Sequence, residues 1–269
     1  MKPLAGQVAI VTGASRGVGK GIALGLGEAG ATVYVTGRSV ARGSLPGTIG
    51  ETADEVTALG GKGIATACDH ADDAQVDALV GRVREAEGRI DVLVNNAFAI
   101  PDGRIAGPFW ELPLEQWDAM HRVGLRSHYV AARAVAPVMI AQRRGLIVNV
   151  SSFGAKIYAL SVAYGVGKAG VDRMTRDMAR ELEPHSVAVV SIWPGIVKTE
   201  RLLDDVERAR LGFDPTNGES PRFSGRAVAA LAADANVMKH AGKPLVVAEL
   251  AHAYGFTDVD GTQPASLRR

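Results

Sequence analysis

The sequence predicts an α/β fold in which a doubly wound parallel sheet carries helices on both faces. Short apolar runs rich in valine and isoleucine alternate with longer segments of helical periodicity, and this alternation is typical of a parallel sheet covered by helices. The 269 residues are 47% hydrophobic and 22% charged, which is enough chain for a large core. No internal repeat or linker is visible, so we predict one domain over residues 1–269.

The order of the elements follows from the apolar runs and their periodicity. The predicted strands cover residues 8–11, 32–37, 63–67, 90–94, 146–150, 187–192 and 245–247. The predicted helices begin with one that opens at Ile22 and continue with 53–59, 73–87, 114–142, 163–183 and 226–233. Three irregular stretches, 98–113, 153–162 and 195–223, each follow the carboxyl end of a strand. That edge is where an open α/β sheet binds its ligand.

A glycine-rich turn joins the first strand to the first helix. Its sequence is Thr12-Gly13-Ala14-Ser15-Arg16-Gly17-Val18-Gly19. Glycines allow the backbone to approach a pyrophosphate closely, and the free N–H groups at the start of the following helix complete an anion site. The spacing is wider than the usual dinucleotide fingerprint, but the first strand–helix boundary is where such a site belongs. We therefore expect Gly13, Gly17 and Gly19 to bind a dinucleotide.

The end of the second strand indicates which dinucleotide this is. An acidic residue there would accept hydrogen bonds from the ribose hydroxyls of NAD, but the chain has Gly37 followed by Arg38. Arg38, together with Arg16 of the glycine turn, offers two guanidinium groups to a 2′-phosphate. We predict that NADP(H) is preferred and that NAD(H) is the weaker cofactor.

Tyr164 and Lys168 are four residues apart, which places a phenol and an ammonium on one face of a helix. A free tyrosine has a pKa of about 10 and becomes a useful acid or base near neutral pH only when a nearby cation stabilises its phenolate. Lys168 would be that cation. The spacing alone is common on solvated helix edges, so the prediction depends on the surrounding motifs.

Composition excludes several other classes of partner. The net charge is +1 without a block of Lys or Arg, which argues against nucleic acid or an anionic membrane as a partner. The single cysteine, Cys68, excludes an intrachain disulfide, and no apolar run reaches the roughly twenty residues of a membrane span. The first strand begins within about seven residues, leaving no room for a signal peptide. We expect a cytoplasmic protein without a metal site.

Taken together, these motifs resemble the short-chain dehydrogenase/reductase superfamily, whose domains have a Rossmann-type fold. The resemblance covers nearly the whole chain and rests on Thr12-Gly13-x-x-x-Gly17-x-Gly19, Asp69, Asn95-Asn96-Ala97, Ser151-Ser152, Tyr164-x-x-x-Lys168 and Pro194-Gly195. Over the central third, the chain resembles the branch called dehydrogenase/reductase member one, through Phe109-Trp110-Glu111, Val123-Gly124-Leu125-Arg126, Tyr164-Gly165-Val166-Gly167-Lys168 and Trp193-Pro194-Gly195-Ile196-Val197.

The resemblance implies a role for each matching residue. Tyr164 would exchange a proton with the oxygen of a carbonyl or alcohol substrate, and Lys168 would lower the pKa of Tyr164 and hold the nicotinamide ribose. A serine would stabilise the same oxygen. Ser152 fits if the preceding strand fixes the alignment, whereas Ser151 fits the family's residue count to the tyrosine; we favour Ser152 because a loop absorbs a deletion more easily. Further cofactor contacts are implied for Ser15, Val18, Asp69, Asn96 and Thr199.

Two positions depart from the family pattern. Phe98 stands where the family has glycine after Asn-Asn-Ala, and Gly124 stands where the family has its helix asparagine. Glycine still supplies a main-chain carbonyl and permits local distortion of the helix. We expect Gly124 to keep a bulge at this place without the side chain.

The predicted substrate is a small carbonyl or alcohol compound with an apolar body. Apolar residues gather in the three strand-end stretches and would line its pocket, namely Phe98, Phe109, Trp110, Phe153, Tyr158, Leu160, Leu202 and Leu203. Relatives pair through the helices beginning near Leu114 and Ala163, so the resemblance also implies a homodimer or homotetramer. The alternative function is a catalytically silent NADP(H)-binding regulatory protein of the same fold, since a fold does not guarantee chemistry.

Overall fold

The structure is a computed structural model that describes residues 2–267. Its centre is a seven-stranded sheet with the order β3-β2-β1-β4-β5-β6-β7, and every neighbouring pair is parallel. The chain crosses from one half of the sheet to the other after β3, so the strand order reverses between the neighbours β1 and β4, and a crevice opens at the carboxyl ends of these two strands. The strands are β1 (Val8–Thr12), β2 (Thr32–Gly37), β3 (Lys62–Ala67), β4 (Val92–Asn95), β5 (Gly145–Val150), β6 (Val187–Trp193) and β7 (Pro244–Val246).

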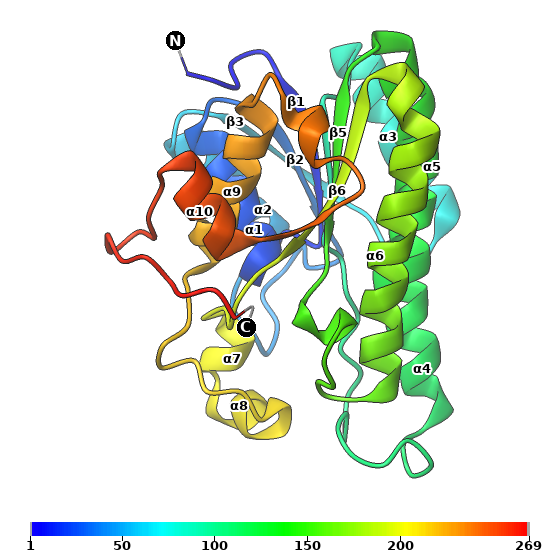
Figure 1. Ribbon diagram of the computed structural model, residues 1–269, viewed down its shortest axis with the longest axis vertical. Coiled ribbons are helices and arrows are strands. Elements are labelled where there is room, and N and C mark those ends of the chain that lie inside the picture. Colours follow the sequence, from blue (N-terminus) through cyan, green and yellow to red (C-terminus); the bar gives the residue numbers. More distant parts are fainter. Residues whose placement is uncertain (1, 268–269) are drawn as a thin grey trace.

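Helices cover both faces of the sheet (Figure 1). One face carries α1 (Gly17–Glu28), α2 (Ile49–Ala58), α9 (Pro221–Ala233) and α10 (Val247–Tyr254). The other face carries α3 (Asp73–Glu87), α5 (Ser127–Gln142) and α6 (Val162–Leu182), with α4 (Leu114–His121) continuing into α5. The short helices α7 (Glu200–Leu203) and α8 (Asp205–Leu211) lie beyond the carboxyl edge of the sheet.

The central strands form because their side chains are buried on both faces. Every residue of β1, β4, β5 and β6 is buried, which explains their continuous runs of valine and isoleucine rather than an alternating pattern. Each face of the sheet has its own apolar core against its helices. Trp193 and Phe223 are among the largest fully buried side chains. The predicted fold class is confirmed.

Some predicted boundaries are wrong, and each error has a local cause. Val247 begins α10 instead of ending the last strand. The stretch 195–223, expected to be irregular, contains α7 and α8, which start from the side-chain caps of Thr199 and Asp204. The expected helix 114–142 is interrupted by a π-helical turn, Arg122–Arg126. Helix α2 starts at Ile49 because Thr48 and Glu51 form a capping box.

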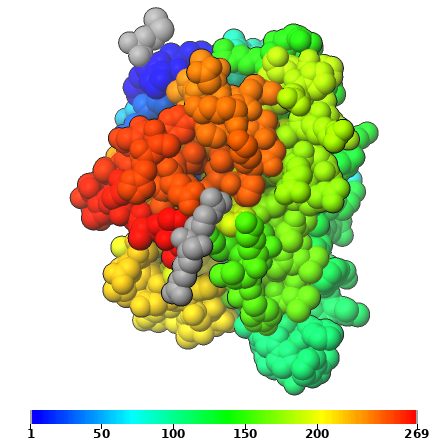
Figure 2. All heavy atoms as spheres, in the orientation of Figure 1, coloured from blue at the N-terminus to red at the C-terminus, as the bar shows by residue number. Residues whose placement is uncertain are grey.

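The carboxyl edge of the sheet is bordered by segments from distant parts of the chain. Figure 2 shows the yellow α7–α8 segment next to the red C-terminal segment on this face of the molecule. Leu267 of that C-terminal segment lines a cavity together with Leu202 and Leu211. Within residues 2–267, no helix combines the length and apolar character needed to cross a membrane.

Candidate active site

Two adjoining cavities lie at the carboxyl edge of the sheet. The first, of about 280 Å³, is lined by the glycine turn and by the ends of β2 and β3. The second, of about 490 Å³, is lined by the segments that follow β5 and β6. Both cavities share a wall made by Val18, Asn96, Phe98, Ile100, Thr199 and Arg201. A bound molecule that passes along these six residues would extend from one cavity into the other.

The glycine turn is packed too tightly for side chains. A Cβ atom on Gly13 would lie 2.8 Å from the Cα of Ala97, and one on Gly19 would lie 2.3 Å from the amide nitrogen of Asn96. Gly13 and Gly17 also have positive φ angles of 65° and 60°, which L-residues adopt reluctantly. The turn therefore brings backbone N–H groups to the floor of the first cavity at the N-terminus of α1.

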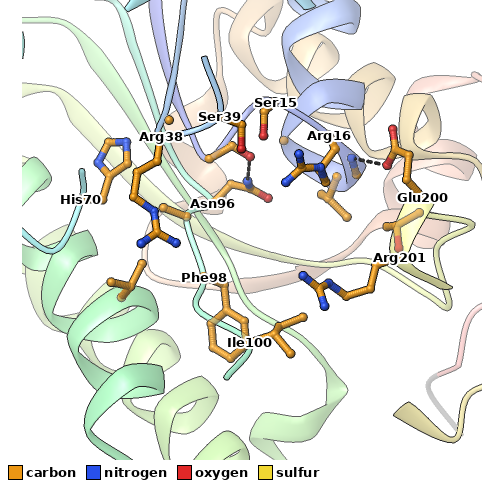
Figure 3. A pocket seen from close by; sticks show the side chains of 18 of the residues that line it. Ser15, Arg16, Arg38, Ser39, His70, Asn96, Phe98, Ile100, Glu200 and Arg201 are labelled. Atoms are coloured by element: carbon orange, nitrogen blue, oxygen red, sulfur yellow. Dashed lines mark hydrogen bonds between the residues drawn. The ribbon is translucent and has the colours of Figure 1, made fainter. Parts of the chain in front are cut away.

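A carboxylate already lies at this N-terminus. The N–H of Gly17 donates to Oε2 of Glu200 at 2.7 Å (Figure 3). An anion is stabilised here because the first N–H groups of α1 have no partner within the helix and the helix dipole is positive at this end. Sequence reasoning missed Glu200, since the two residues are 183 positions apart and no local pattern links them.

The two predicted arginines lie differently. Arg16 donates to the carbonyl oxygens of Pro46 and Gly47 at 2.9 and 2.8 Å, so its guanidinium anchors the segment after β2. Arg38 lines the same cavity, and its side chain makes no hydrogen bond or ion pair to any residue in the described part of the chain. The structure thus brings both arginines to the first cavity and leaves only Arg38 free to bind an added phosphate.

The other predicted cofactor residues also line the first cavity, namely Ser15, Val18, Asp69, Asn96 and Thr199. The amide nitrogen of Asn96 donates to the carbonyls of Thr12 and Gly13 at 2.8 and 3.0 Å, so this side chain holds the glycine turn in place. Thr199 caps α7. The neighbouring Asn95 donates to Asn149 of β5 at 2.9 Å and so ties two strands together.

His70 is a second lining residue that sequence reasoning missed. It is buried in the segment that follows β3, where Nε2 lies 2.9 Å from the hydroxyl of Thr36. Burial lowers the pKa of His70 to about 4, so the ring is neutral at physiological pH. The signal was weak because a lone histidine after a strand has no motif around it. Among residues 2–267, no cluster of His, Cys, Asp and Glu is arranged to hold a metal ion.

Tyr164 and Ser152 meet in the second cavity. The phenol of Tyr164 donates to Oγ of Ser152 at 2.8 Å, and both residues line the cavity. Ser161 caps α6 by accepting from the N–H of Tyr164 at 3.3 Å, which fixes Tyr164 in the first turn of the helix. The two hydroxyls therefore form a pair that one substrate oxygen can contact.

Ser151 points in another direction. Its hydroxyl is buried and donates to the carbonyl of Lys168 at 3.2 Å.

We expect Ser152→Ala to lower kcat by about a hundredfold, because one donor to the developing charge is lost. Ser151→Ala should leave kcat nearly unchanged and cost about 1 kcal/mol of stability. Steady-state kinetics of both variants measure this, and a larger kcat loss in Ser151→Ala would show that the assignment is reversed.

Lys168 lies behind Tyr164 and is almost completely buried. Its Nζ donates to the carbonyl of Val150 at 3.0 Å and lies 5.8 Å from the centre of the Tyr164 ring. Burial lowers the pKa of Lys168 to about 8, while the carboxylate of Asp172 acts in the opposite direction. Lys168 is therefore still mostly protonated at neutral pH.

The pKa of Tyr164 differs from the prediction. The sequence predicts that Lys168 lowers this pKa. In the structure the pKa of Tyr164 is raised, because burial raises it more than the hydrogen bond with Ser152 lowers it. The reason is the geometry just described, because the ammonium is directed at a backbone carbonyl. At neutral pH the phenol is protonated and can donate its proton.

Asp172 links α6 to the neighbouring strand β6. Its carboxylate accepts from Ser191 at 2.7 Å and from the indole N–H of Trp193 at 3.0 Å. Burial raises the pKa of Asp172, and hydrogen bonds from Ser191, Ser151 and Trp193 oppose that rise. These contacts fix α6 relative to β5 and β6, and so fix the position of Tyr164 relative to Ser152.

The second cavity is apolar, but its walls differ in part from the prediction. Phe98, Phe153, Leu160 and Leu202 line it as expected. The other four residues expected there do not, because they are exposed on the surface instead: Phe109, Trp110, Tyr158 and Leu203. Long loops bend away from the sheet, so membership of a strand-end loop does not decide which side chains face the cavity.

Gly124 marks the break between α4 and α5. The residue has φ 144° and ψ −19° inside the π-helical turn, a conformation that glycine tolerates and other residues avoid. The expected local distortion is therefore present. A side chain could not be restored here without strain, because a Cβ would lie 2.4 Å from the Phe98 ring.

Comparison with known proteins agrees with this geometry. A family model described as short chain dehydrogenase matches residues 7–209. The chain belongs to the short-chain dehydrogenase family. It is therefore an NAD(P)-dependent oxidoreductase.

Two relatives and two solved structures illustrate the family. "Dehydrogenase/reductase SDR family member 1" of Mus musculus is 43% identical over 96% of this chain and 85% of that protein. A 3-oxoacyl-[acyl-carrier-protein] reductase of Synechocystis is 35% identical over 74% of this chain and 78% of that protein. A putative dehydrogenase from Xanthomonas campestris has a TM-score of 0.82 at 29% identity, covering 96% of this chain and 92% of its own. A metagenomic short-chain oxidoreductase in complex with NADP has a TM-score of 0.74 at 35% identity, covering 91% and 97%.

Proposed function

We propose that this protein interconverts a carbonyl group and an alcohol with NADP(H), on a small substrate that has an apolar body. The observation that carries the proposal is the 2.8 Å contact between the hydroxyls of Tyr164 and Ser152, beside a buried, charged Lys168. These groups lie in the apolar cavity that adjoins the glycine turn. A proton donor and an oxygen-binding hydroxyl are what carbonyl reduction requires from the protein.

The first cavity fits a dinucleotide. Its floor is a glycine turn that side chains would fill, and a carboxylate already occupies the anion position at Gly17. Ser15, Val18 and Asn96 would hold the pyrophosphate and a ribose, Asp69 would lie near the adenine, and Thr199 near the carboxamide. Glu200 would have to leave Gly17 when phosphates bind, because two anions would compete for one N–H group.

Each polar residue of the second cavity would have its own role in the reaction. NADPH, when bound, would supply the hydride for the reduction. Tyr164 donates its proton to the carbonyl oxygen, and Ser152 donates a hydrogen bond to the same oxygen. Lys168 would hold the nicotinamide ribose, and it would stabilise the phenolate that remains once its ammonium turns from the Val150 carbonyl toward Tyr164. In alcohol oxidation the same groups act in reverse, with Tyr164 as the base.

Arg38 supports the preference for NADP(H). We expect Arg38→Ala to raise the KM for NADPH about ten- to a hundredfold, because a charged hydrogen bond to the 2′-phosphate contributes roughly 1.5–3 kcal/mol. The KM for NADH should change little. The matched control is Arg84→Ala, at an exposed position on α3. Equal effects of Arg38→Ala on both cofactors would refute the assignment of Arg38 to the phosphate.

Subunit pairing is part of the proposal. Exposed apolar side chains gather on α4 and on the faces of α5 and α6, namely Leu114, Trp117, Tyr129, Val162 and Val166. Such a group is more typical of a contact surface than of a monomer's exterior. A homodimer or homotetramer would cover it, and sedimentation would measure the mass. The cytoplasmic location stays a prediction from the sequence.

The test of function is NADPH oxidation, followed by absorbance, against a panel of apolar ketones, aldehydes and quinones. NADH is assayed alongside. Turnover with at least one carbonyl, faster with NADPH, is the expected result. Tight NADPH binding without turnover on any member of the panel would favour the catalytically silent binding protein instead.

A further inference from the structure

Phe98 stands at the junction of the two cavities, directly beside the reacting groups. It follows β4 and lines both cavities. The centre of its ring lies 4.8 Å from Nζ of Lys168. The ring also packs edge-on against Tyr164, with the ring centres 5.8 Å apart and the planes at 87°. One aromatic side chain thus contacts both members of the Tyr–Lys pair (Figure 3 shows Phe98 on the cavity wall).

The backbone around Gly124 leaves the space that this ring fills. Gly124 carries no side chain, and a Cβ there would lie 2.4 Å from Cδ2 of Phe98. The N–H of Ala99 donates to the carbonyl of Val123 at 2.9 Å, which ties the segment of Phe98 to the same turn. The ring is therefore held in place from behind by the break between α4 and α5.

The surroundings of Lys168 give the ring an electrostatic role. The titratable groups that face Lys168 are Tyr164 and Asp172 on α6 and His128 on α5. Burial lowers the pKa of His128 to about 3, so this ring is neutral and adds no positive charge beside Lys168. The Val150 carbonyl is the one hydrogen-bond acceptor that Nζ reaches within the described residues. The carboxylate of Asp172 also favours the ammonium, and the electron-rich face of Phe98, 4.8 Å from Nζ, adds to this effect.

We propose that Phe98 is a positioning residue of the catalytic centre, which keeps Lys168 charged and directed past Tyr164 by placing an aromatic face against its ammonium. The inference rests on the function proposed above. An aliphatic residue of similar volume would occupy the same space. It would not attract the ammonium in the same way, because only the aromatic ring carries a quadrupole.

The experiment compares Phe98→Leu with Phe98→Tyr. Leucine keeps the cavity dry but removes the aromatic face, whereas tyrosine keeps that face. Carbonyl reduction requires charged Lys168 and so declines as pH rises through the pKa of Lys168, about 8. In Phe98→Leu the amine loses its proton earlier, so we expect the alkaline limb of kcat to move about one pH unit toward acid. The loss is then about fivefold at pH ~8, approaches tenfold at pH ~9 and is small at pH ~6, while Phe98→Tyr keeps the wild-type profile.

Two results would overturn the proposal. One is a kcat that Phe98→Leu lowers by the same factor at every pH, which is the signature of a packing role alone. The other is a Leu profile identical to that of the wild type. Thermal unfolding checks that each variant is folded, and Phe98→Met, also unbranched at Cβ and without a ring, replaces Leu if that variant is not.

The proposed function can fail separately. If the wild-type protein turns over no carbonyl, the pH dependence of NADPH affinity is measured in the same variants, because Lys168 would also hold the ribose. Weakening of NADPH binding at lower pH in Phe98→Leu than in the wild type would still support the role of Phe98. Unchanged binding profiles would refute it.

Discussion

Tyr164→Phe is expected to lower kcat for carbonyl reduction by about a hundred- to ten-thousandfold, while the affinity for NADPH changes little. The phenol donates to Ser152 at 2.8 Å, and positioned acid–base groups contribute effects of this size. The pKa of Tyr164 is raised by burial, so the wild-type group holds its proton near neutral pH. Steady-state kinetics and NADPH fluorescence titration measure the two quantities.

The control for Tyr164→Phe is Tyr158→Phe. Tyr158 is 73% exposed and does not line the apolar cavity, so its hydroxyl should be dispensable. The fold should survive in Tyr164→Phe, because one lost hydrogen bond costs about 1 kcal/mol. Retention of most of the wild-type kcat in Tyr164→Phe would contradict the proposed mechanism.

Gly21→Ala is expected to destabilise the protein by about 3 kcal/mol and to weaken cofactor binding. Helices α1 and α9 approach so closely that a Cβ on Gly21 would lie 1.9 Å from the carbonyl oxygen of Pro221. Backbone atoms cannot rotate away, so the helices must separate, and overpacking of this kind costs about 1–3 kcal/mol or more. The gain in helix propensity from glycine to alanine, about 1 kcal/mol, is smaller. Urea unfolding measures the difference.

Gly81→Ala is the matched control. Gly81 lies within α3, and a Cβ there would meet nothing within 4 Å. Only the propensity term then remains, so this variant should be more stable by about 0.5–1 kcal/mol. If both alanine variants changed stability in the same direction, close packing of α1 on α9 would not be the reason for glycine at position 21.

The fold was predictable because its signals are local. Buried parallel strands appear as continuous apolar runs, because both faces of the sheet are covered. The errors lie where capping or kinking decides. Helices α7 and α8 depend on the caps of Thr199 and Asp204, and in the sequence these two residues look like ordinary loop residues. Val247 lies at the boundary between a strand and a helix, and its residue type suits either element.

The site was predictable in its parts but not in its contacts. The sequence indicated Gly13, Tyr164 and Lys168 as site residues by motif and spacing, and all three lie at the two adjoining cavities. It did not indicate that Arg16 would bind the carbonyls of Pro46 and Gly47. Surface arginines have several partners within reach, so the choice depends on a neighbouring loop whose path no short pattern encodes.

By itself, the sequence determined the doubly wound sheet, the glycine turn and the Tyr164–Lys168 spacing, because each depends on residues within a few positions of one another. The tertiary structure alone decided that the Ser151 hydroxyl binds the carbonyl of Lys168, that Glu200 lies against Gly17, and that Phe98 fills the space beside Gly124. These outcomes depend on the direction of side chains brought together from distant segments. Packing selects that direction, since each ring, carboxylate and hydroxyl takes the one position where space and a partner coincide.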